Sequence, residues 1–540
     1  MLARSILTAA ATVLFHAIFS SAYFEAGIKN SVENGRGTVH VNGTTTILTP
    51  NNVTVRLKDT SDSGICETTP GVKSWSGYVD ISADDHIFFW FFESRRDPAN
   101  DPITLWLDGG PGGDSLIGVF LEVGPCSVNA NYTPILNPHS FNEVSNLLFI
   151  SQPVGVGFSY GTTKVKTTEV AAKAVWEALQ AFSVGLPVVD KTVAIRDFNL
   201  FTSSYGGHYG PGFFEYFNIK NTEIEQGTIN GTRLRLSSLG IVDGLISERI
   251  QAPFYPEFAI HNTYGIKAVD DFVYNSMKIA LNGPEGCLHK IKTCNTAREE
   301  DVDRNTTLIK DACLAADIVC TLGVEGAFLQ FSGRNPQDIR KGLREVGNSS
   351  KSLNFQRYVN FSSVQRALGV DREYSPLNET INQGFHDAGD TVYEDFLNDL
   401  GSLLDRNVRV SLIYGDADYI CNWFGGEAVS LAIDHSDRVE FSKTEYAAMI
   451  VRGVEYGQVR QYGNLSFTRI YEAGHAMNID QPIAAFAHFN RTINGFDVAT
   501  GKVLVTDEYE SHGSPIASHV GWPTQIASGP LGNRGVPIEA

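Results

Sequence analysis

Short apolar runs, each bounded by Gly, Pro or Asp, recur along the chain. One densely aromatic run lies at residues 87–92, and others lie at residues 103–107, 147–150, 198–201, 239–242, 408–414 and 467–471. Unbroken apolar runs of this length are typical of strands that are buried on both faces. Between two of them, Val175, Leu179 and Phe182 follow the i, i+4, i+7 spacing of a helix face. Strands that alternate with helices predict an α/β fold with an open, mostly parallel central sheet flanked by helices.

The pattern changes over residues 246–350, where strand signals thin out and four cysteines cluster. We interpret this stretch as a mostly helical cap inserted into the sheet. Residues 23–75 are polar and turn-rich, and the last forty residues are rich in Gly, Pro, Ser and Thr without periodicity. The predicted division is a signal peptide at 1–22, an N-terminal arm at 23–75, the first part of the core at 76–245, the cap insertion and return to the core at 246–395, the second part of the core at 396–500, and an irregular tail at 501–540.

The charge balance narrows the class of function. The chain has 42 Lys and Arg against 61 Asp and Glu, which gives a net charge of −19. Nucleic-acid binding requires a basic face, so this balance argues against a nucleic-acid partner and against adhesion to an anionic membrane. A hydrophobic content of 42% allows a sizeable core. An acidic, well-packed chain suits a soluble secreted protein that works at low pH.

The first residues resemble a secretory signal peptide. Arg4 precedes an apolar run from Ile6 to Phe19, and the small residues before and including Ala22 suit a cleavage site. The alternative is a membrane anchor, but the run is shorter than the ~20 residues that a span needs. We expect no other long apolar run, and therefore no membrane partner. The predicted destination is the extracellular medium, with the vacuole as an alternative.

Cysteine and asparagine patterns agree with secretion. Seven cysteines in an oxidising compartment predict disulfides with one cysteine left unpaired, and the four between 287 and 320 would staple the cap. A zinc site is the alternative for that cluster, but no Cys-x2-Cys pair is present. The connectivity of the six paired cysteines stays open. Candidate glycosylation sites are Asn42, Asn52, Asn131, Asn230, Asn305, Asn348, Asn360, Asn378, Asn464 and Asn490.

A serine stands where an apolar strand turns into a helix. The strand at 198–201 is followed by Ser203, Ser204, Tyr205 and then by a helical pattern from His208. A serine in such a turn is held exposed above the sheet edge, and the N–H group of the next residue can bind an oxyanion. The usual first glycine of this motif is Thr202 here. By itself the motif is weak, and a Ser-rich loop before a helix explains it better.

Two further residues follow this serine in the chain order of a Ser-Asp-His catalytic triad. Asp418 follows the strand at 408–414, and His475 follows the strand at 467–471. Ser, Asp and His at three strand ends, in that order, indicate nucleophile, orienting carboxylate and general base. The loop at 106–112 also follows a strand, and its glycines can supply a second oxyanion donor. A phosphate loop is the alternative, but the Lys-Ser/Thr pair is absent, so we expect no nucleotide; no other cofactor or metal is predicted.

These motifs resemble the serine carboxypeptidase family, and most of all its secreted fungal branch, over residues 60–495. The resemblance rests on CETTPGV at 66–72, SGYVD at 76–80, WLDGGPG at 106–112, QPVGVGFSY at 152–160, SYGGHYGP at 204–211, VQRALGV at 364–370, GDADYICNW at 415–423 and GH at 474–475. It implies an α/β-hydrolase fold, with Ser204 as nucleophile, Asp418 and His475 as its partners, and Gly110 and Tyr205 as the oxyanion hole. It also implies that Cys421 is the free thiol.

The resemblance fails at the site that would hold the substrate's C-terminal carboxylate. In the family an Asn in the glycine-rich loop and two Glu side chains hold it. Here Glu122 is kept, the Asn position is Asp108 beside Gly109, and the Glu before the nucleophile is Ser203. Carboxyls can hold a carboxylate only by sharing protons, which favours acidic pH. An ionised Asp108 would instead repel the peptide terminus. The family's Asp before Gln152 is Ser151, and a Cys found in many relatives is Gly113.

Three hypotheses follow for the function. The first is a secreted serine carboxypeptidase that releases C-terminal amino acids from peptide substrates through an acyl-enzyme, at acidic pH. The second is an acyltransferase or esterase on the same scaffold, because the carboxylate-binding residues are altered. The third is a non-catalytic secreted glycoprotein, which the presence of all three triad residues disfavours. The sequence does not determine the oligomeric state.

Overall fold

A computed structural model describes residues 31–33, 36–41, 43–49, 53–185, 196–300, 307–343, 345, 349–392 and 396–517. The predicted signal peptide lies outside these residues, as does the tail after residue 517. Four of the candidate glycosylation sites also lie outside them: Asn42, Asn52, Asn305 and Asn348.

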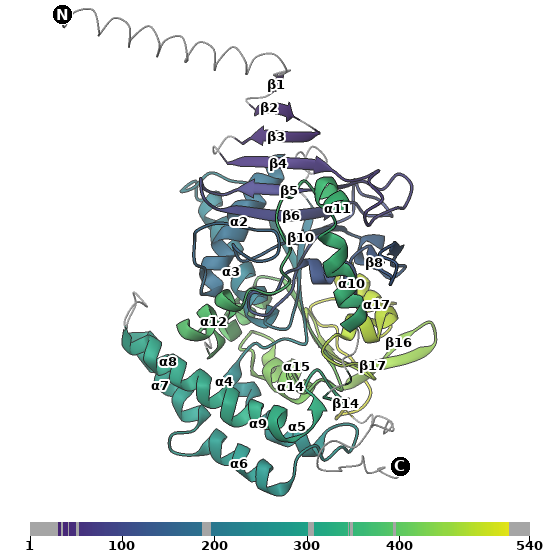
Figure 1. Cartoon of the computed structure of the whole chain (residues 1–540). Helices are drawn as coiled ribbons and strands as arrows, with labels where there is room; N and C mark the ends of the chain where they lie inside the picture. Colours follow the sequence, from purple (N-terminus) through teal and green to yellow (C-terminus); the bar gives the residue numbers. More distant parts are fainter. Residues whose placement is uncertain are drawn as a thin grey trace, which may run out of the picture.

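One large sheet runs through the molecule (Figure 1). Its strands, in spatial order, are β1 Ser31–Glu33, β2 Arg36–Val41, β3 Thr44–Leu48, β4 Thr54–Asp59, β5 Ser74–Asp80, β6 His86–Phe92, β10 Asn146–Ile150, β7 Ile103–Leu107, β11 Asp197–Ser203, β12 Arg235–Val242, β15 Arg409–Gly415, β18 Leu465–Ile470, β17 Val454–Tyr462 and β16 Tyr446–Val451. Two hairpins lie outside the sheet: β8 Cys126–Val128 with β9 Pro134–Leu136, and β13 Arg334–Asn335 with β14 Asp338–Gly342.

The sheet is parallel at its centre and antiparallel toward both edges. Strands β10, β7, β11, β12, β15 and β18 pair in parallel, which confirms the six runs predicted as parallel strands. The aromatic run is β6, which pairs antiparallel with β10 and joins the meander β1–β6 to the parallel centre. Strands β17 and β16 extend the other edge in antiparallel order. The sheet is therefore mixed, and its parallel centre brings the carboxyl ends of the six strands to one edge.

Successive residues of the central strands enter two separate cores. In β6, Ile87, Phe89 and Phe91 belong to the core on one face of the sheet. Phe88 and Trp90, which alternate with them, belong to the core on the other face. A strand covered on both faces has no polar positions to alternate with apolar ones, which is why these runs are unbroken.

Helices cover both faces of the sheet (Figure 1). Helices α2, α3, α12 and α13 pack on the first core, and η1, α10, α11 and α17 pack on the second. Their bounds are η1 Gly118–Glu122, η2 Phe141–Glu143, α2 Thr168–Gly185, α3 Gly206–Glu225, α10 Ser349–Val359, α11 Ser362–Leu368, α12 Glu379–Ala388, η5 Asp390–Val392, α13 Phe396–Asp405, α14 Trp423–Ala432, α15 Arg438–Lys443, α16 Met477–Asp480 and α17 Pro482–Ile493. The predicted helices at 175–182 and from His208 are α2 and α3.

The predicted helical insertion lies between β12 and β15. Its helices are α4 Glu248–Gln251, α5 Phe254–His261, α6 Asp271–Asn282, α7 Cys287–Glu300, α8 Thr307–Ile318, η4 Val319–Glu325 and α9 Gly326–Phe331. Disulfides Cys287–Cys320 and Cys294–Cys313 tie α7 to α8 and η4, and a third disulfide joins Cys66 to Cys126. Cys421 is the unpaired cysteine, as expected.

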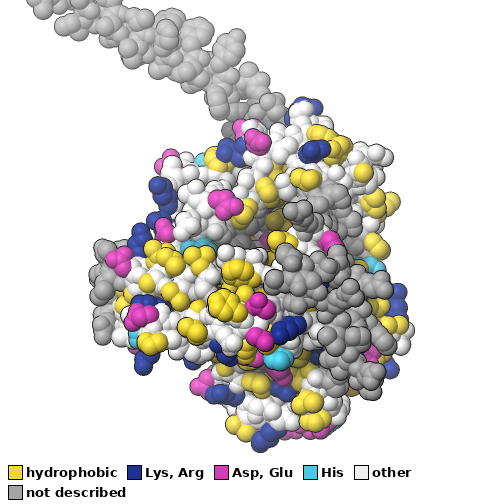
Figure 2. All heavy atoms as spheres, turned by 60° about the horizontal axis from the view of Figure 1, so that its bottom comes forward, with side chains coloured by type: hydrophobic (Ala, Val, Ile, Leu, Met, Phe, Trp, Pro, Cys, Tyr) yellow, Lys and Arg dark blue, Asp and Glu magenta, His cyan; other side chains and the backbone are white. Residues whose placement is uncertain are grey.

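The insertion carries an apolar outer face. Phe272 and Ile279 of α6 and Leu322 of η4 are largely exposed, and apolar side chains gather on this face of the molecule in Figure 2. The helical stretch Ile309–Phe331 is long and apolar enough, by length and composition alone, to cross a membrane. The expectation of no further long apolar run is therefore wrong. The two disulfides of the insertion anchor this stretch to α7.

Both ends of the described chain pack on the sheet edges. The Thr-rich stretch of the predicted N-terminal arm forms β2–β4, because β-branched residues favour strands even where the pattern is polar. At the other end, residues 501–517 contain no helix or named strand, but they lie along β16 and β17 through bridges at Tyr446–Ser514 and Tyr462–Glu510.

The described glycosylation candidates differ in accessibility. Asn131 and Asn230 are exposed. Asn360, Asn378, Asn464 and Asn490 are half-buried. The Asn378 side chain caps α12 and donates to Gly155 O at 2.8 Å. Glycosylation remains a prediction, and the two exposed residues are the ones most open to it.

Candidate active site

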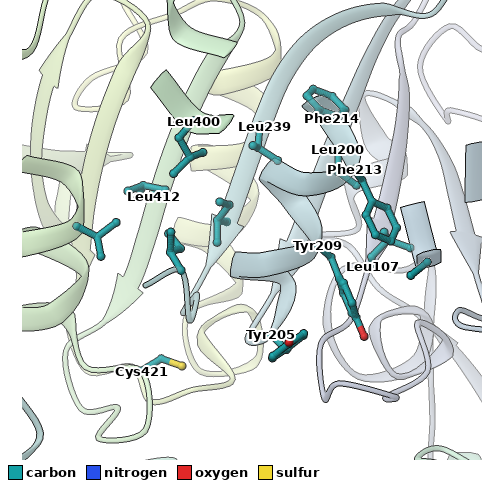
Figure 3. Close-up of a cluster of buried hydrophobic side chains, with 14 of the residues drawn as sticks. Leu107, Leu200, Tyr205, Tyr209, Phe213, Phe214, Leu239, Leu400, Leu412 and Cys421 are labelled. Carbon is teal, nitrogen blue, oxygen red and sulfur yellow. The ribbon is translucent and has the colours of Figure 1, made fainter. Parts of the chain in front are cut away.

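The predicted nucleophile lies in a strained turn between β11 and α3. Ser204 has a φ of 62°, a region that costs a non-glycine residue about 1–3 kcal/mol. Backbone hydrogen bonds hold the turn: Ser204 N donates to Val242 O at 2.9 Å, and Leu245 N donates to Ser204 O at 3.0 Å. The core behind this turn is packed with the apolar residues of α3, β11, β12 and β15. In Figure 3, Tyr205 and Cys421 lie at the loop end of that cluster.

The glycine-rich loop after β7 packs directly against the nucleophile turn. A Cβ atom at Gly109 would lie 2.4 Å from Tyr205 N and 2.6 Å from Ser203 O, so only glycine fits there. Among the described residues, the N–H groups of Gly110 and Tyr205 donate no hydrogen bond. Two free N–H groups that flank a serine are the arrangement that an oxyanion hole requires.

His475 and Asp418 meet at the ends of β18 and β15. His475 Nδ1 bonds to Asp418 Oδ2 at 2.7 Å, and Asp418 Oδ1 accepts from Ile420 N at 2.9 Å. His475 N donates to Gln337 O at 2.7 Å, which fixes the histidine loop. Burial lowers the pKa of His475 and the Asp418 carboxylate raises it, with a net rise. The Asp418 bond occupies Nδ1 and leaves Nε2 as the nitrogen that can face a nucleophile.

The serine and the histidine come from β11 and β18, whose carboxyl ends lie on the same edge of the sheet. No hydrogen bond joins the Ser204 and His475 side chains, both of which lie in the described part of the chain. Bonds between nucleophile and base are often long in substrate-free enzymes and tighten when substrate binds.

Asp108, which is buried, and Glu122, which is half-buried, form a coupled carboxyl pair. Asp108 Oδ2 accepts from Trp106 Nε1 at 3.1 Å and from Gly118 N at 2.9 Å. Glu122 ends the π-helix η1, and Asn478 Nδ2 donates to its Oε2 at 2.9 Å. Burial and the Glu122 carboxyl raise the pKa of Asp108 well above its ordinary value, and burial raises the pKa of Glu122 as well. Both carboxyls therefore keep their protons to a higher pH than ordinary carboxyls do, and a protonated carboxyl can donate to a carboxylate.

Ser203, the fourth residue of the predicted carboxylate site, ends β11 and is buried. It brings no charge to the site. Glu122 lies close enough to His475 for its charge to raise the pKa of the imidazole. The carboxyl pair and the base thus form one electrostatic unit, in which the protonation of Glu122 affects the basicity of His475.

A further buried carboxyl, that of Asp114, lies beside Ser151, the position at which the family resemblance predicts an Asp. Asp114 follows the glycine-rich loop and is fully buried. It accepts a hydrogen bond from Leu116 N at 3.3 Å, and the hydroxyls of Ser151 and Tyr374 lie near enough to lower its pKa. Burial raises its pKa to about 6. The family resemblance places a carboxyl at position 151, whereas in this chain a carboxyl stands beside that position, at Asp114.

An acidic cavity of about 240 Å³ opens beside the nucleophile. Its lining includes Gly110, Ser204 and Tyr205, together with Glu248 and Glu325 of the helical insertion. Burial raises the pKa of Glu248 to about 8 and that of Glu325 to about 7. The lining also includes His386 and Asp317, which pair at 2.9 Å, and the free thiol of Cys421. This wall can receive a polar or cationic group next to Ser204.

Sequence reasoning missed these residues. Glu248, Glu325 and Asp317 lie in an insertion whose helices show no motif, so only their packing against the sheet edge brings them to the cavity. Asn478 lies three residues after His475, and this proximity is the one signal that could have indicated it. Two groups of described residues have ligand atoms close enough to hold a metal ion: Glu248–Cys287–Cys320, in which both cysteines are disulfide-bonded, and Asp418–Cys421–His475, which contains two residues of the predicted triad.

Comparisons with known proteins show the family to which the chain belongs. The family model described as serine carboxypeptidase matches residues 64–495. Carboxypeptidase S1 homolog B of Arthroderma otae is 37% identical over 514 residues, covering 83% of this chain and 77% of that protein. Carboxypeptidase S1 of Penicillium janthinellum is 36% identical over 433 residues, covering 80% of this chain and 97% of that protein.

A solved structure shows the same fold. The prohormone-processing carboxypeptidase Kex1(delta)p of Saccharomyces cerevisiae aligns with a TM-score of 0.60 and 19% identity, covering 78% of this chain and 91% of that one. A family match over most of the chain, together with relatives above 30% identity, identifies the family. This chain belongs to the serine carboxypeptidase family, and its function is that of a serine carboxypeptidase, a hydrolase of peptides.

Proposed function

We propose that Ser204, His475 and Asp418 carry out the reaction. Ser204 Oγ attacks the carbonyl carbon of the last peptide bond while His475 Nε2 takes its proton. The N–H groups of Gly110 and Tyr205 stabilise the oxyanion. The C–N bond then breaks, His475 returns the proton to the departing amine, and an ester to Ser204 remains. Water attacks that ester by the same steps in reverse, and the shortened peptide acid leaves.

The observation that carries this proposal is the His475–Asp418 bond at 2.7 Å, at the strand ends beside the Ser204 turn. Asp418 is fully buried. A buried carboxylate bonded to Nδ1 fixes the tautomer that exposes Nε2 as a base, and it stabilises the imidazolium that forms.

We further propose that Asp108 and Glu122 hold the C-terminal carboxylate of the substrate at acidic pH. Because burial raises the pKa of both carboxyls, they keep their protons in acid and can donate to the substrate. As pH rises they ionise and repel it. Protonation of Glu122 also removes one of the charges that raise the pKa of His475, so the base remains available in acid.

We propose that the protein is secreted. The three disulfides fit an oxidising compartment, either outside the cell or in the vacuole. The predicted signal peptide and the glycosylation candidates favour the extracellular medium.

The test is release of amino acids from blocked dipeptides between about pH 3 and about pH 8. Wild type is compared with Ser204→Ala and with Ser203→Glu, which restores the charge that the family has before the nucleophile. Release that peaks in acid and disappears in Ser204→Ala supports the proposal. Acid release that is unchanged in Ser204→Ala would contradict the role of this serine.

The altered carboxylate site favours a second candidate, an acyltransferase or esterase on the same scaffold. Ser203 brings no charge, and an Asp stands at position 108. This candidate predicts no release by wild type, release by Ser203→Glu, and turnover of small esters or acyl transfer to an alcohol. A serine-directed phosphonate that fails to label wild type would instead favour the non-catalytic glycoprotein.

A further inference from the structure

Asn478 has an unusual position in the site. It lies in the short helix α16, which begins two residues after His475, and its side chain is 2% exposed. Its Nδ2 donates to Glu122 Oε2 at 2.9 Å. Its Oδ1 is buried and has no hydrogen-bond partner among the described residues. A buried, unpaired amide oxygen beside a carboxyl is rare enough to require an explanation.

An amide and a neutral carboxyl are complementary. The amide offers one N–H donor and one oxygen acceptor, and a protonated carboxyl offers one O–H donor and one oxygen acceptor. The donor half of this pair is present between Asn478 and Glu122. The acceptor half is the unpaired Oδ1, which a protonated Glu122 can satisfy and an ionised Glu122 cannot.

The helix that carries Asn478 is also hydrogen-bonded to the loop that carries His475. Asp480, two residues later in α16, accepts from Gly474 N at 2.9 Å. One short helix thus contacts the loop of the general base on one side and Glu122 on the other. A fixed spacing between these two groups is what the proposed reaction needs, because the substrate spans them.

We infer that Asn478 is a positioning residue of the carboxylate site: its amide orients Glu122 toward the C-terminal carboxylate of the substrate and couples it to the His475 loop. When Glu122 is protonated and the site is empty, Oδ1 accepts the Glu122 hydroxyl, and on substrate binding this hydroxyl rotates to the substrate carboxylate without movement of the side chain. The inference rests on the proposed role of Glu122 in holding that carboxylate.

Binding to a catalytically inactive background tests the inference directly. In Ser204→Ala, dissociation constants are measured for a benzyloxycarbonyl-blocked dipeptide and for the same dipeptide with a C-terminal amide. Added Asn478→Ala should weaken binding of the acid at least about tenfold and change binding of the amide much less. Asn478→Ser is the second variant if the alanine variant folds poorly.

A matched control separates positioning from folding. Asn221 is also buried and bonds both backbone groups of Leu234, near the end of α3 that is remote from Ser204. Asn221→Ala should lower the melting temperature without changing the ratio of acid to amide binding. Equal loss of acid and amide binding in Asn478→Ala would overturn the inference.

Coupling to Glu122 gives a second readout. If Asn478 acts through Glu122, the losses in Asn478→Ala and Glu122→Gln should not add in the double variant. Full additivity would contradict the inference.

The two proposals fail in different ways. Absence of amino-acid release by wild type would contradict the proposed function, whereas the binding measurements use the inactive variant and need no turnover. Selective loss of acid binding in Asn478→Ala supports the positioning role whatever the rate of hydrolysis. Wild-type binding that does not distinguish acid from amide would overturn both the carboxylate role of Glu122 and the inference.

Discussion

The carboxyl of Asp108 should limit activity at neutral pH, and Asp108→Asn should remove this limit. Trp106 Nε1 and Gly118 N donate to one oxygen of Asp108, at 3.1 and 2.9 Å. An asparagine can keep both bonds with its amide oxygen and offer its NH₂ group where the protonated carboxyl offers O–H. The variant therefore replaces a donor that exists only in acid by one that exists at every pH.

The sign and size of the effect follow from the environment of Asp108. Burial and Glu122 raise the pKa of Asp108 well above its usual value, so the group is neutral in acid and ionises as pH rises. A hydrogen bond to a charged group contributes about 1.5–3 kcal/mol. Since each ~1.4 kcal/mol is a factor of ten, we expect Asp108→Asn to raise kcat/KM at neutral pH by about 10- to 150-fold. In acid the change should stay within a few fold.

The assay is kcat/KM for a blocked dipeptide with a free C-terminus, measured across the pH range on wild type and variant. Asp497→Asn is the matched control, because Asp497 is buried in a loop after α17, where it accepts from Thr500 N and Val503 N. This control should lower stability and leave the shape of the pH profile unchanged. An Asp108→Asn profile that keeps the wild-type alkaline limit would refute the reasoning, as would an equal loss at all pH values.

Three further predictions follow from the site and the insertion. Gly109→Ala should abolish measurable hydrolysis, because its Cβ would lie 2.4 Å from Tyr205 N; hydrolysis within about tenfold of wild type would show that the loop can shift. Burial raises the pKa of Glu325 to about 7, so its carboxyl becomes charged only as pH rises past that value. Substrates with Lys or norleucine on the acyl side of the scissile bond are compared by kcat/KM. The preference for Lys should increase with pH in wild type and should not change with pH in Glu325→Gln. The same pH dependence in both proteins would contradict a contact between Glu325 and the Lys side chain. Replacing Cys287 and Cys320 together by Ser should lower the free energy of unfolding by about 3–4 kcal/mol, because this disulfide closes a loop with a sequence separation of 33. An unchanged midpoint of denaturant unfolding would contradict this prediction.

Local patterns were sufficient for the central sheet. The strands buried on both faces produce unbroken apolar runs, and all six runs predicted as parallel strands lie side by side in the structure. The N-terminal strands were not predicted, because β2–β4 lie at a sheet edge and their polar threonines resemble a loop in composition. The connectivity of the disulfides also required the fold, because spacing alone does not select among pairings.

The sequence by itself determined the parallel core, the order of Ser204, Asp418 and His475 at strand ends, and the family. These features are local: a strand end and the residue that follows it are adjacent in the chain. Only the tertiary structure decided that Asn478 bonds Glu122 and that Glu248 and Glu325 reach the cavity beside Ser204. It also decided that Asp114 faces Ser151. Each of these contacts joins residues that are distant in sequence. The raised pKa values of the carboxyl groups in these contacts come from burial, which no local sequence pattern encodes.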